Sequence, residues 1–584
     1  MEDHFTYGPC RGPCAVCGQP GAVCARCRVA FYCGKDHQRM HWKLHKPVCG
    51  CLEVRTDERV GRHIVAIKDI PARTILMREL PLVVFPFNPT QALLQPDTED
   101  LEPIEGGKVC LCVACCMKVD NPIPCVHCGW PLCKRSCPHL DRHSTECAAF
   151  QMGKYKYHGD ITSVDTTDLD LLAAIRIWLA SHKEKERGPR LLKLQHEIPA
   201  PSAKKGTVDA AMLKKASELF WKKVLSTAVR ALLVMGSNER EANEGIKRAL
   251  GSSLINSFGS NHGLNNRKGE SPFLYQYSGA ALYAGLSLLE HSCVPNARTA
   301  QADGDSDAVI LVASRDIAAG EHVTISYHDN PLANLHERWV DNATRGFVCR
   351  CELCEDPTEK GTYFNAWCCT TCKRNDRKNL VTLVGAFGWR CKVCKASGPN
   401  PDPAVQELQK SFRHLQVLMA LDENPAGEGV QRLWQGYIDA ALWPKGPLHP
   451  THHLVVKAAA ELLTLGDNVC PPRQPATLRE AAYLVEHCRK LLDVIDVLRP
   501  PINTYRREVV MYLFNFNLEK LLLHRGQRQS NTRTLKSTID KLKKELSDLL
   551  ADIRHISISQ RELETCERLQ TQFGLVSGMA SLFM

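Results

Sequence analysis

This chain contains no apolar run long enough to cross a membrane. Its longest uncharged apolar stretch, around residues 278–289, is well short of the roughly 20 residues that a spanning helix requires. The N-terminus, Met1-Glu2-Asp3-His4, has neither a basic segment nor an apolar core, so we expect no secretory signal. Aromatic residues make up only 7% of the 584 residues, but hydrophobic residues make up 44%, which argues against global disorder. We therefore expect a soluble protein of the nucleus, the cytoplasm or both, with about three or four domains.

Cysteine is scarce in the C-terminal third, where only Cys470, Cys488 and Cys566 of the 29 cysteines lie after residue 395. The others crowd into four clusters. Disulfides are rare in the nucleus and cytosol, so this density predicts zinc thiolates. The ligands assigned below include 21 thiolates on six Zn²⁺ ions, which add −21 + 12 = −9 and bring the formal charge of +10 close to +1. Bulk charge therefore gives no reason to expect direct DNA binding.

The first cluster offers eight ligands, enough for two tetrahedral zinc ions. Its two Cys-x2-Cys pairs predict tight knuckles, and a helix over residues 38–49 would place His45 and Cys49 on one face. The spacing closely resembles a MYND zinc finger. The resemblance implies one ion held by Cys14, Cys17, Cys33 and His37 and another held by Cys24, Cys27, His45 and Cys49. His41 is a rival ligand, and a cluster of free buried cysteines is the alternative to a zinc finger.

A second cluster repeats this pattern about 98 residues further along the chain. Cys110 and Cys116 leave the identity of its first pair open. The predicted ligands are Cys112, Cys115, Cys125, Cys128, Cys133, Cys137, His143 and Cys147.

The two remaining clusters are smaller. The third, Cys349, Cys351 and Cys354, needs a fourth ligand from elsewhere in the chain. The fourth has the spacing of a zinc ribbon and predicts one closed structural ion, with Cys368 as a possible substitute for the first ligand. Its predicted ligands are Cys369, Cys372, Cys391 and Cys394.

Between the clusters the sequence predicts a small β-rich unit interrupted by helices. Residues 60–72 and 312–320 each indicate a strand followed by a turn, and residues 322–327 indicate another strand. Residues 171–180 and 210–233 predict helices. After residue 403, apolar residues recur at helical spacing, as in 405–419 and 484–498, and Thr477-x-x-Glu480 predicts a capping box.

Four segments carry a more specific resemblance: Asn256-Ser257-Phe258, residues 282–296 with Glu290-His291-Ser292-Cys293, Thr324-Ile325-Ser326-Tyr327, and residues 347–351. They look like the motifs of a SET domain. With the MYND finger and the helical tail, the chain resembles the SET-and-MYND (SMYD) methyltransferase family over nearly its whole length, and its second finger resembles the arthropod branch. The resemblance implies that Cys293 completes the third zinc site.

The same resemblance implies an S-adenosylmethionine pocket and a lysine channel. Tyr327 would orient the substrate amine. Three positions depart from the family pattern: His63 replaces a glycine, Glu290 an asparagine and Arg345 a second channel tyrosine. The implied cofactor-binding residues are Arg62, His63, Asn256, Ser287, Leu288, Leu289, Glu290, His291 and Phe347.

The predicted fold is α+β: a zinc-finger-rich split β-type SET domain with MYND-like fingers and an all-α, TPR-like C-terminal domain. The predicted units are a MYND finger (10–50), the first SET part (51–108), a second finger (109–148), a helical insertion (149–255), the SET core (256–348), the post-SET site with a ribbon (349–400) and a helical domain (401–584).

The predicted function is transfer of a methyl group from S-adenosylmethionine to a lysine of a histone or another protein, with a role in chromatin and transcription regulation. The alternative is a weakly active or inactive SET-fold adaptor whose MYND fingers recruit proline-containing peptides to repress transcription. About six structural Zn²⁺ ions are expected, and neither DNA nor a membrane is an expected partner.

Overall fold

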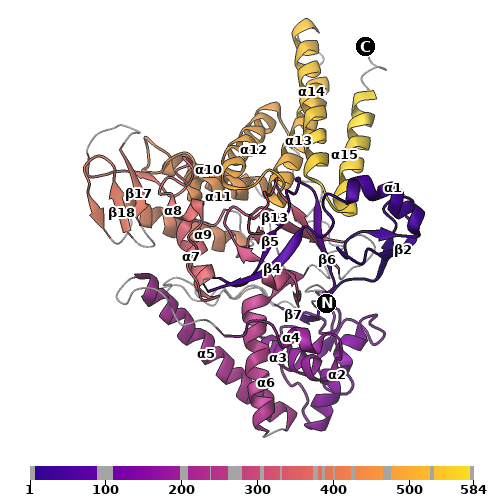
Figure 1. The fold of residues 1–584 in the computed structure, drawn as a ribbon. Helices are drawn as coiled ribbons and strands as arrows, with labels where there is room; N and C mark the ends of the chain where they lie inside the picture. Colours follow the sequence, from indigo (N-terminus) through magenta and orange to yellow (C-terminus); the bar gives the residue numbers. More distant parts are fainter. Residues whose placement is uncertain are drawn as a thin grey trace.

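The computed structural model describes residues 7–58, 60–87, 110–197, 208–236, 239–260, 279–302, 308–328, 332–372, 379–384, 388–398, 402–421, 428–464, 475–526 and 532–578. Cys470, residue 278 and residues 88–108 of the predicted first SET part lie outside these ranges. Helices and short sheets both occur, which confirms the predicted α+β class, while the domain boundaries stay predictions. Strands gather at the centre of Figure 1, and helical arms extend above and below them.

The central β unit is assembled from two distant parts of the chain. Strands β4 (Leu52–Asp57) and β5 (Gly61–Ala66) pair with each other, and β6 (Ile75–Glu79) joins β14 (Val309–Ala313) and β13 (Ala297–Gln301) in the order β13-β14-β6. Strand β7 (Val83–Pro86) pairs with β11 (Gly279–Leu282), which pairs with β10 (Phe258–Ser260). The predicted SET core is therefore split, with the second finger and a group of helices inserted between its halves.

The strand predicted over residues 322–327 is shorter than expected. Only β15 (Thr324–Ile325) forms a ladder, parallel to β12 (Glu290–His291). Residues 322 and 323 pair with β5 instead, through a bridge between Val65 and His322 and a 2.8 Å bond from the Val323 amide to the Ile64 carbonyl oxygen. The side chain of Asn296 adds two bonds: its amide donates to the carbonyl oxygen of His322 at 2.8 Å and its oxygen accepts from the Thr324 amide at 2.8 Å. This crossing fastens the segment 290–296 to the segment 322–327.

The insertion is mainly helical. It contains α2 (Leu140–Met152), α3 (Thr166–Lys183), α4 (Gly188–Leu191), α5 (Val208–Met235) and α6 (Arg240–Asn256). Helices α3 and α5 confirm the helices predicted over residues 171–180 and 210–233, and each is longer than predicted. The second finger shares one buried core with these helices, in which Trp130 stacks on Tyr157 with ring centroids 4.3 Å apart.

The C-terminal part is a series of stacked helices. They are α9 (Pro403–Leu421), α10 (Glu428–Ala441), α11 (His453–Thr464), α12 (Leu478–Leu498), α13 (Thr504–Gly526), α14 (Thr532–Ile556) and α15 (Gln560–Gly578). One of the two hydrogen bonds of the capping box predicted at α12 is present: the Thr477 hydroxyl accepts from the Glu480 backbone amide. The Glu480 carboxylate accepts from the backbone amide of Ala476, whereas a capping box would have it accept from the backbone amide of Thr477. The two prolines after Arg499 follow the helix end as predicted.

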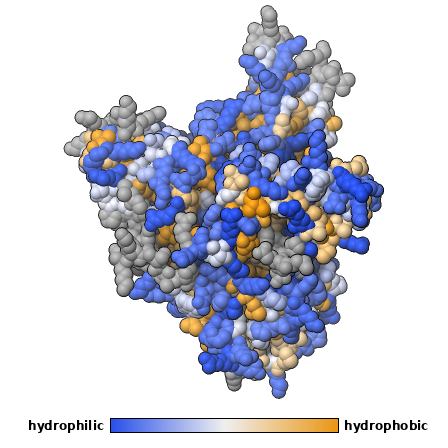
Figure 2. Space-filling view, in the orientation of Figure 1, coloured by the Kyte–Doolittle hydropathy of each residue, from blue (hydrophilic) through white to orange (hydrophobic). Residues whose placement is uncertain are grey.

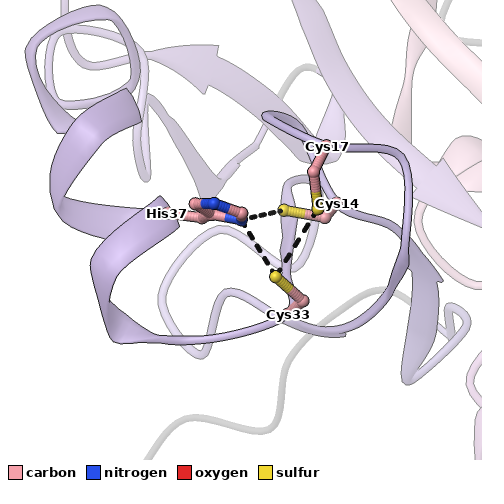
Figure 3. A group of neighbouring side chains, drawn as sticks. All are labelled: Cys14, Cys17, Cys33 and His37. Carbon is pink, nitrogen blue, oxygen red and sulfur yellow. Dashed lines mark hydrogen bonds between the residues drawn. The ribbon is translucent and has the colours of Figure 1, made fainter.

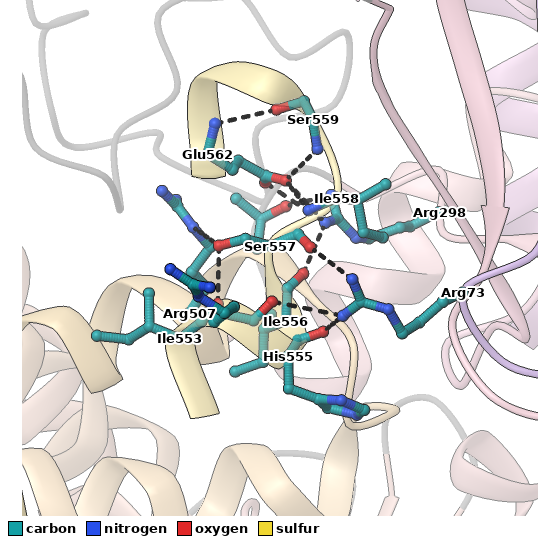
Figure 4. A network of polar contacts seen from close by, with 12 residues as sticks. Arg73, Arg298, Arg507, Ile553, His555, Ile556, Ser557, Ile558, Ser559 and Glu562 are labelled. Carbon is teal, nitrogen blue, oxygen red and sulfur yellow. Dashed lines mark hydrogen bonds and ion pairs between the residues drawn. The ribbon is translucent and has the colours of Figure 1, made fainter. Parts of the chain in front are cut away.

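Two arginines of the central β unit, Arg73 in the turn before β6 and Arg298 on β13, hold the junction between α14 and α15 (Figure 4). Arg73 donates to the carbonyl oxygens of His555 and Ser557, and Arg298 donates to the carbonyl oxygen of Ile556 at 3.2 Å. Because these carbonyls end a helix, they have no partners within it. The helical tail is thus hydrogen-bonded to the central β unit at strand β13 and at the turn before β6.

Small sheets and a helix frame the zinc clusters. The first finger has β1 (Arg11–Pro13), β2 (Pro20–Val23), β3 (Phe31–Tyr32) and α1 (Lys35–His45), and the second has β8 (Ile123–Pro124) and β9 (Pro131–Leu132). The ribbon is a sheet of β16 (Trp367–Cys368), β17 (Leu380–Val384), β18 (Gly388–Cys391) and β19 (Ser397–Gly398).

The surface is mostly hydrophilic on the face drawn in Figure 2, with smaller hydrophobic patches. Within the described ranges no helix is both long and apolar enough to span a bilayer.

Candidate functional site

The first predicted zinc group comes together as the resemblance to a MYND finger implied. Cys14, Cys17, Cys33 and His37 surround one point (Figure 3), with ligand atoms within 4.8 Å of one another. The Cys17 and Cys33 sulfurs are 3.6 Å apart and the His37 Nδ1 lies 3.0 Å from the Cys33 sulfur. Two sulfurs bound at ~2.3 Å in a tetrahedron would be about 3.8 Å apart, so the group fits Zn²⁺.

The second group of this finger consists of Cys24, Cys27, His45 and Cys49, which confirms the interleaved pairing. The helix ends at His45, four residues earlier than predicted, and Cys49 is brought back by its amide, which donates to the His45 carbonyl oxygen at 2.9 Å. His41 is not a ligand, because its Nδ1 is hydrogen-bonded to the Tyr32 hydroxyl at 2.9 Å.

The second finger is buried, whereas the first is partly exposed. Its two groups are Cys112, Cys115, Cys133 and Cys137, and Cys125, Cys128, His143 and Cys147. Cys110 and Cys116 stand outside them: the Cys110 thiol donates to the Ile161 carbonyl oxygen, and Cys116 is fully buried. The open question about the first pair is therefore resolved in favour of Cys112 and Cys115.

A buried carboxylate orients the histidine ligand of this finger. Glu146 Oε1 lies 3.0 Å from His143 Nδ1 and also pairs with Arg176, whose guanidinium donates to the carbonyl oxygens of Val84 and Val113 at 2.9 and 2.8 Å. A carboxylate on the second ring nitrogen fixes the orientation of a zinc-bound imidazole. Sequence reasoning missed this relay, although Glu146 follows His143 by three residues on α2 and so lies on the same helix face.

The ribbon sulfurs are also close together. Cys369 lies 3.7 Å from Cys394 and Cys372 lies 3.5 Å from Cys391, measured between sulfurs. Cys369 rather than Cys368 is therefore the first ligand, since the side chains of successive strand residues point to opposite faces.

The third cluster is closed by Cys293, as the resemblance implied. Its sulfur lies 3.4 Å from that of Cys354 and 3.9 Å from that of Cys349, and Cys351 completes the group. Four thiolates and one Zn²⁺ carry a net charge of −2. Two buried arginines, Arg338 and Arg499, lie close enough to these thiolates to interact with them electrostatically. Neither arginine was predicted, because each is isolated in the sequence.

The predicted catalytic tyrosine lies beside this zinc group. The Tyr327 hydroxyl donates to the carbonyl oxygen of Leu289, and the Tyr327 amide donates to His291 Nδ1 at 2.9 Å. The other ring nitrogen of His291 lies 3.3 Å from the Cys293 sulfur. Burial raises the pKa of Tyr327 to about 12, against the opposing effect of Arg345, so the phenol is neutral at physiological pH.

The turn that carries the predicted cofactor motif is held by a residue that the sequence did not reveal. Glu79, fully buried at the end of β6, accepts from the amides of Gly285 and Leu286 at 2.7 and 2.9 Å and from the Tyr7 amide at 3.2 Å. The Gly285 and Leu286 amides lie at the start of the short 3₁₀ helix η2 (Leu286–Leu288). Burial raises the pKa of Glu79 to about 7, partly offset by the three amides.

The predicted cofactor-binding residues fall into neighbouring groups. The guanidinium of Arg62 donates to the carbonyl oxygen of Lys193 at 2.5 Å. The side-chain amide of Asn256 donates to the carbonyl oxygen of Gln195 at 2.7 Å. Both therefore contact the segment 192–197, which together with Arg62 and Arg248 lines a cavity of about 410 Å³. The Ser287 hydroxyl donates to the Tyr283 carbonyl oxygen at 2.6 Å, and Leu288 and Leu289 are buried.

His63 and Glu290, two of the three departures from the family pattern, both contact His322. The His63 and His322 rings stack with centroids 4.4 Å apart, and His322 Nδ1 pairs with the Glu290 carboxylate. The bulk that His63 adds is thus buried against the hydrogen-bonded pair of His322 and Glu290.

Arg345 lies at the tyrosine. Its guanidinium carbon is 5.2 Å from the centroid of the Tyr327 ring, and its Nη1 donates to the Ile255 carbonyl oxygen at 2.6 Å. Phe347 meets the same tyrosine edge-on, with centroids 6.1 Å apart. The structure therefore brings Tyr327, Leu289, His291, Arg345 and Phe347 together. Their roles stay predictions.

Comparisons with known proteins identify two domain families in this chain. The MYND finger family matches residues 14–49, and the SET domain family matches residues 61–328. The SET domain-containing protein SmydA-8 of Drosophila melanogaster, isoform B, is 24% identical over 346 residues, which cover 58% of this chain and 66% of the relative. The histone-lysine N-methyltransferase ATXR2 of Arabidopsis thaliana is 39% identical over 77 residues, 13% of this chain and 16% of the relative. The chain thus spans slightly less than two thirds of the length of SmydA-8.

Proposed function

Because this chain belongs to the SET-and-MYND (SMYD) protein family, we propose that it is an S-adenosylmethionine-dependent methyltransferase acting on lysines of histone or other protein tails. One observation carries the proposal: the Tyr327 hydroxyl donates to the Leu289 carbonyl oxygen. This contact joins the implied cofactor motif to the implied catalytic strand at the zinc group that Cys293 closes.

The chain's own residues are suited to orientation and exclusion of water, which do most of the work in methyl transfer. When bound, S-adenosylmethionine supplies an electrophilic methyl group on a sulfonium. The neutral hydroxyl of Tyr327 would position the amine nitrogen, because a phenol with a pKa of about 12 remains a hydrogen-bonding group rather than a base. His291 fixes the backbone of Tyr327, and Phe347 and Leu288 supply apolar walls.

The cofactor would lie between the turn that Glu79 holds and the cavity beside Arg62. The cavity of about 410 Å³ is within the range of small-molecule sites, ~300–1,000 Å³. Asn256 would support this site indirectly, since its amide is hydrogen-bonded to the carbonyl oxygens of Gln195 and Ser252.

Calorimetry tests whether the protein binds the cofactor, and a methyl-transfer assay tests whether it is an enzyme. Purified protein is expected to bind S-adenosylmethionine, and Tyr327→Phe is expected to lower methyl transfer to a peptide array about 100-fold while leaving cofactor affinity nearly unchanged. Absence of cofactor binding would remove the enzymatic proposal. An unchanged rate in Tyr327→Phe would remove the tyrosine from the mechanism.

The second candidate function is an adaptor with weak or no activity, and two observations favour it. Arg345 places a cation on Tyr327, and the first finger exposes apolar side chains on and beside α1: Met40 is 68% and Leu44 is 73% exposed. Such a surface suits proline-containing peptides, and recruitment in the nucleus would repress transcription. Peptide binding by the isolated full chain without cofactor binding, together with nuclear fluorescence of a tagged protein, would support this candidate.

A further inference from the structure

Arg345 is a half-buried cation that lies over the ring of Tyr327. Among the residues that the structure describes, no acidic side chain lies within ion-pairing distance of its guanidinium, which contacts the Tyr327 ring and the Ile255 carbonyl oxygen. A cation over an aromatic face contributes only about 0.5–2 kcal/mol. A half-buried guanidinium would be stabilised further by an anion, and Arg is the side chain best shaped to bind a carboxylate through two hydrogen bonds.

The charged groups around this position do not supply that anion. Glu290 on β12 is committed to His322. Asp341 on α7 (Leu335–Ala343) lies 3.3 Å from His328 Nδ1, measured at its Oδ2, and forms no ion pair with Arg345. Burial raises the pKa of Asp341 to about 6, and Arg345 acts on it only at longer range, lowering that pKa. His291 and Tyr327 are neutral neighbours. Arg338 and Arg499 face the zinc thiolates instead.

The position of Arg345 makes the approach to Tyr327 electropositive, because its guanidinium carbon lies 5.2 Å from the centroid of the Tyr327 ring. A substrate ammonium that approaches Tyr327 therefore meets repulsion unless the substrate also carries negative charge. Like-charge repulsion of this kind is a common device for rejecting the wrong partner.

We propose that Arg345 is a specificity-determining residue that recognises an acidic residue flanking the target lysine. The substrate carboxylate would bind the guanidinium and draw it from the Tyr327 ring, which frees that aromatic face for the lysine stem. This inference rests on the proposed function, because it assumes that the lysine approaches Tyr327. It adds a substrate class, lysine within an acidic sequence, that the comparisons do not provide.

The test is binding of two matched peptides to the full zinc-loaded chain in the presence of S-adenosylhomocysteine, measured by fluorescence anisotropy. One peptide carries a single lysine flanked by Asp and Glu, and the other carries Asn and Gln in the same places. The wild type is expected to bind the acidic peptide about 10-fold more tightly, because the peptide carboxylate would form charge-assisted hydrogen bonds with Arg345. The preference should shrink when salt is raised from about 50 to about 300 mM, which shortens the Debye length.

Substitutions separate this role from a structural one. Arg345→Gln should abolish the preference, and Arg345→Glu should reverse it toward peptides with flanking Arg or Lys. The matched control is Lys222→Glu, which makes the same change of charge on an exposed side chain of α5 and should keep the wild-type preference. Each variant is compared for its zinc content and thermal midpoint, so that misfolding is recognised.

The outcomes distinguish the two proposals. Equal binding of the two peptides by the wild type, or a preference that persists in Arg345→Gln, overturns the role of Arg345 even if methyl transfer occurs. If the preference for the acidic peptide is lost in Arg345→Gln but no peptide is methylated by the wild type, Arg345 recognises acidic peptides and the enzymatic proposal is removed.

Discussion

The Nη1 atom of Arg499 donates a hydrogen bond of 2.6 Å to the carbonyl oxygen of Cys293. Arg499 is the first residue after α12, and Cys293 is a zinc ligand within the predicted cofactor motif. The helical tail therefore contacts the site through a buried cation beside a zinc group of net charge −2. This contact makes the C-terminal helices part of the framework of the site.

Loss of this contact should destabilise the protein. Arg499→Met leaves a buried carbonyl oxygen without that donor and should lower the free energy of unfolding by about 1–3 kcal/mol. The control is Arg489→Met, which breaks an ion pair with Glu545 whose side chains are 55% and 32% exposed and should cost at most about 1 kcal/mol. Urea unfolding of the three proteins measures both. Equal effects of the two substitutions would contradict the prediction.

The zinc content of the protein should show whether Cys293 holds a zinc ion of its own, apart from those of the fingers. The wild type is expected to bind about six zinc ions, and Cys293→Ser about five with loss of S-adenosylmethionine binding, because a structural zinc site needs four ligands. Cys10→Ser, at an exposed cysteine outside the zinc groups, should retain both properties. Elemental analysis and calorimetry provide the two measurements. Retained cofactor binding in a five-zinc Cys293→Ser protein would show that this site does not shape the pocket.

Breaking the buried ion pair between Arg176 and Glu146 beside the second finger should lower the free energy of unfolding. Arg176→Met leaves Glu146, which is 0% exposed, without its cation, and breaking such a pair typically costs about 3–5 kcal/mol. The double variant Arg176→Met/Glu146→Met removes both charges and should be more stable than the single variant. Thermal unfolding compares them. A double variant no more stable than the single one would mean that the arginine acts through its bonds to Val84 and Val113 alone.

Glu79 should make stability depend on pH near neutrality. Its pKa is raised by burial to about 7 in the folded protein, so the folded state binds this proton more tightly than the unfolded state. The stabilisation is fully present below a pH of about 4.5 and is lost as the pH rises through about 7, by up to about 3 kcal/mol.

Denaturant midpoints between pH 5 and pH 8 for wild type and Glu79→Gln test this. The stability of the wild type relative to the variant should fall as the pH rises. The exposed substitution Glu53→Gln should give a constant difference. A constant difference for Glu79→Gln as well would contradict the assignment.

The docking of the last two helices should depend on Arg298. Its guanidinium lies 3.3 Å from Glu562 Oε2, with side chains 11% and 13% exposed (Figure 4). Arg298→Ala should speed hydrogen exchange of residues 556–562, because these amides then open locally at lower free energy. Arg506→Ala, which breaks contacts to Asp496 and Asp552 within the helical tail, should leave the SET sheet junction protected. Unchanged exchange in Arg298→Ala would show that Arg73 alone holds the junction.

Zinc spacing and helical periodicity were the most predictive features of the sequence. The ligand pairs of the first finger follow from local knuckles and one helix, and α9 and α12 follow from apolar residues at helical intervals. The strand over residues 322–327 was predicted too long, because His322 and Val323 pair with β5 while Thr324 and Ile325 pair with β12, and no local pattern signals that change of partner.

The sequence by itself determined the zinc groups, the helical tail and the motifs of the SET core, because these depend on short-range spacing and periodicity. Only the tertiary structure decided which isolated residues support the site. Glu79, Arg176, Arg298 and Arg499 have no sequence signature, since their partners lie 30 to 264 residues away. It also placed Arg345 on Tyr327, a contact that depends on how α6, β15 and the segment after α7 pack, and that packing is set by the buried core as a whole.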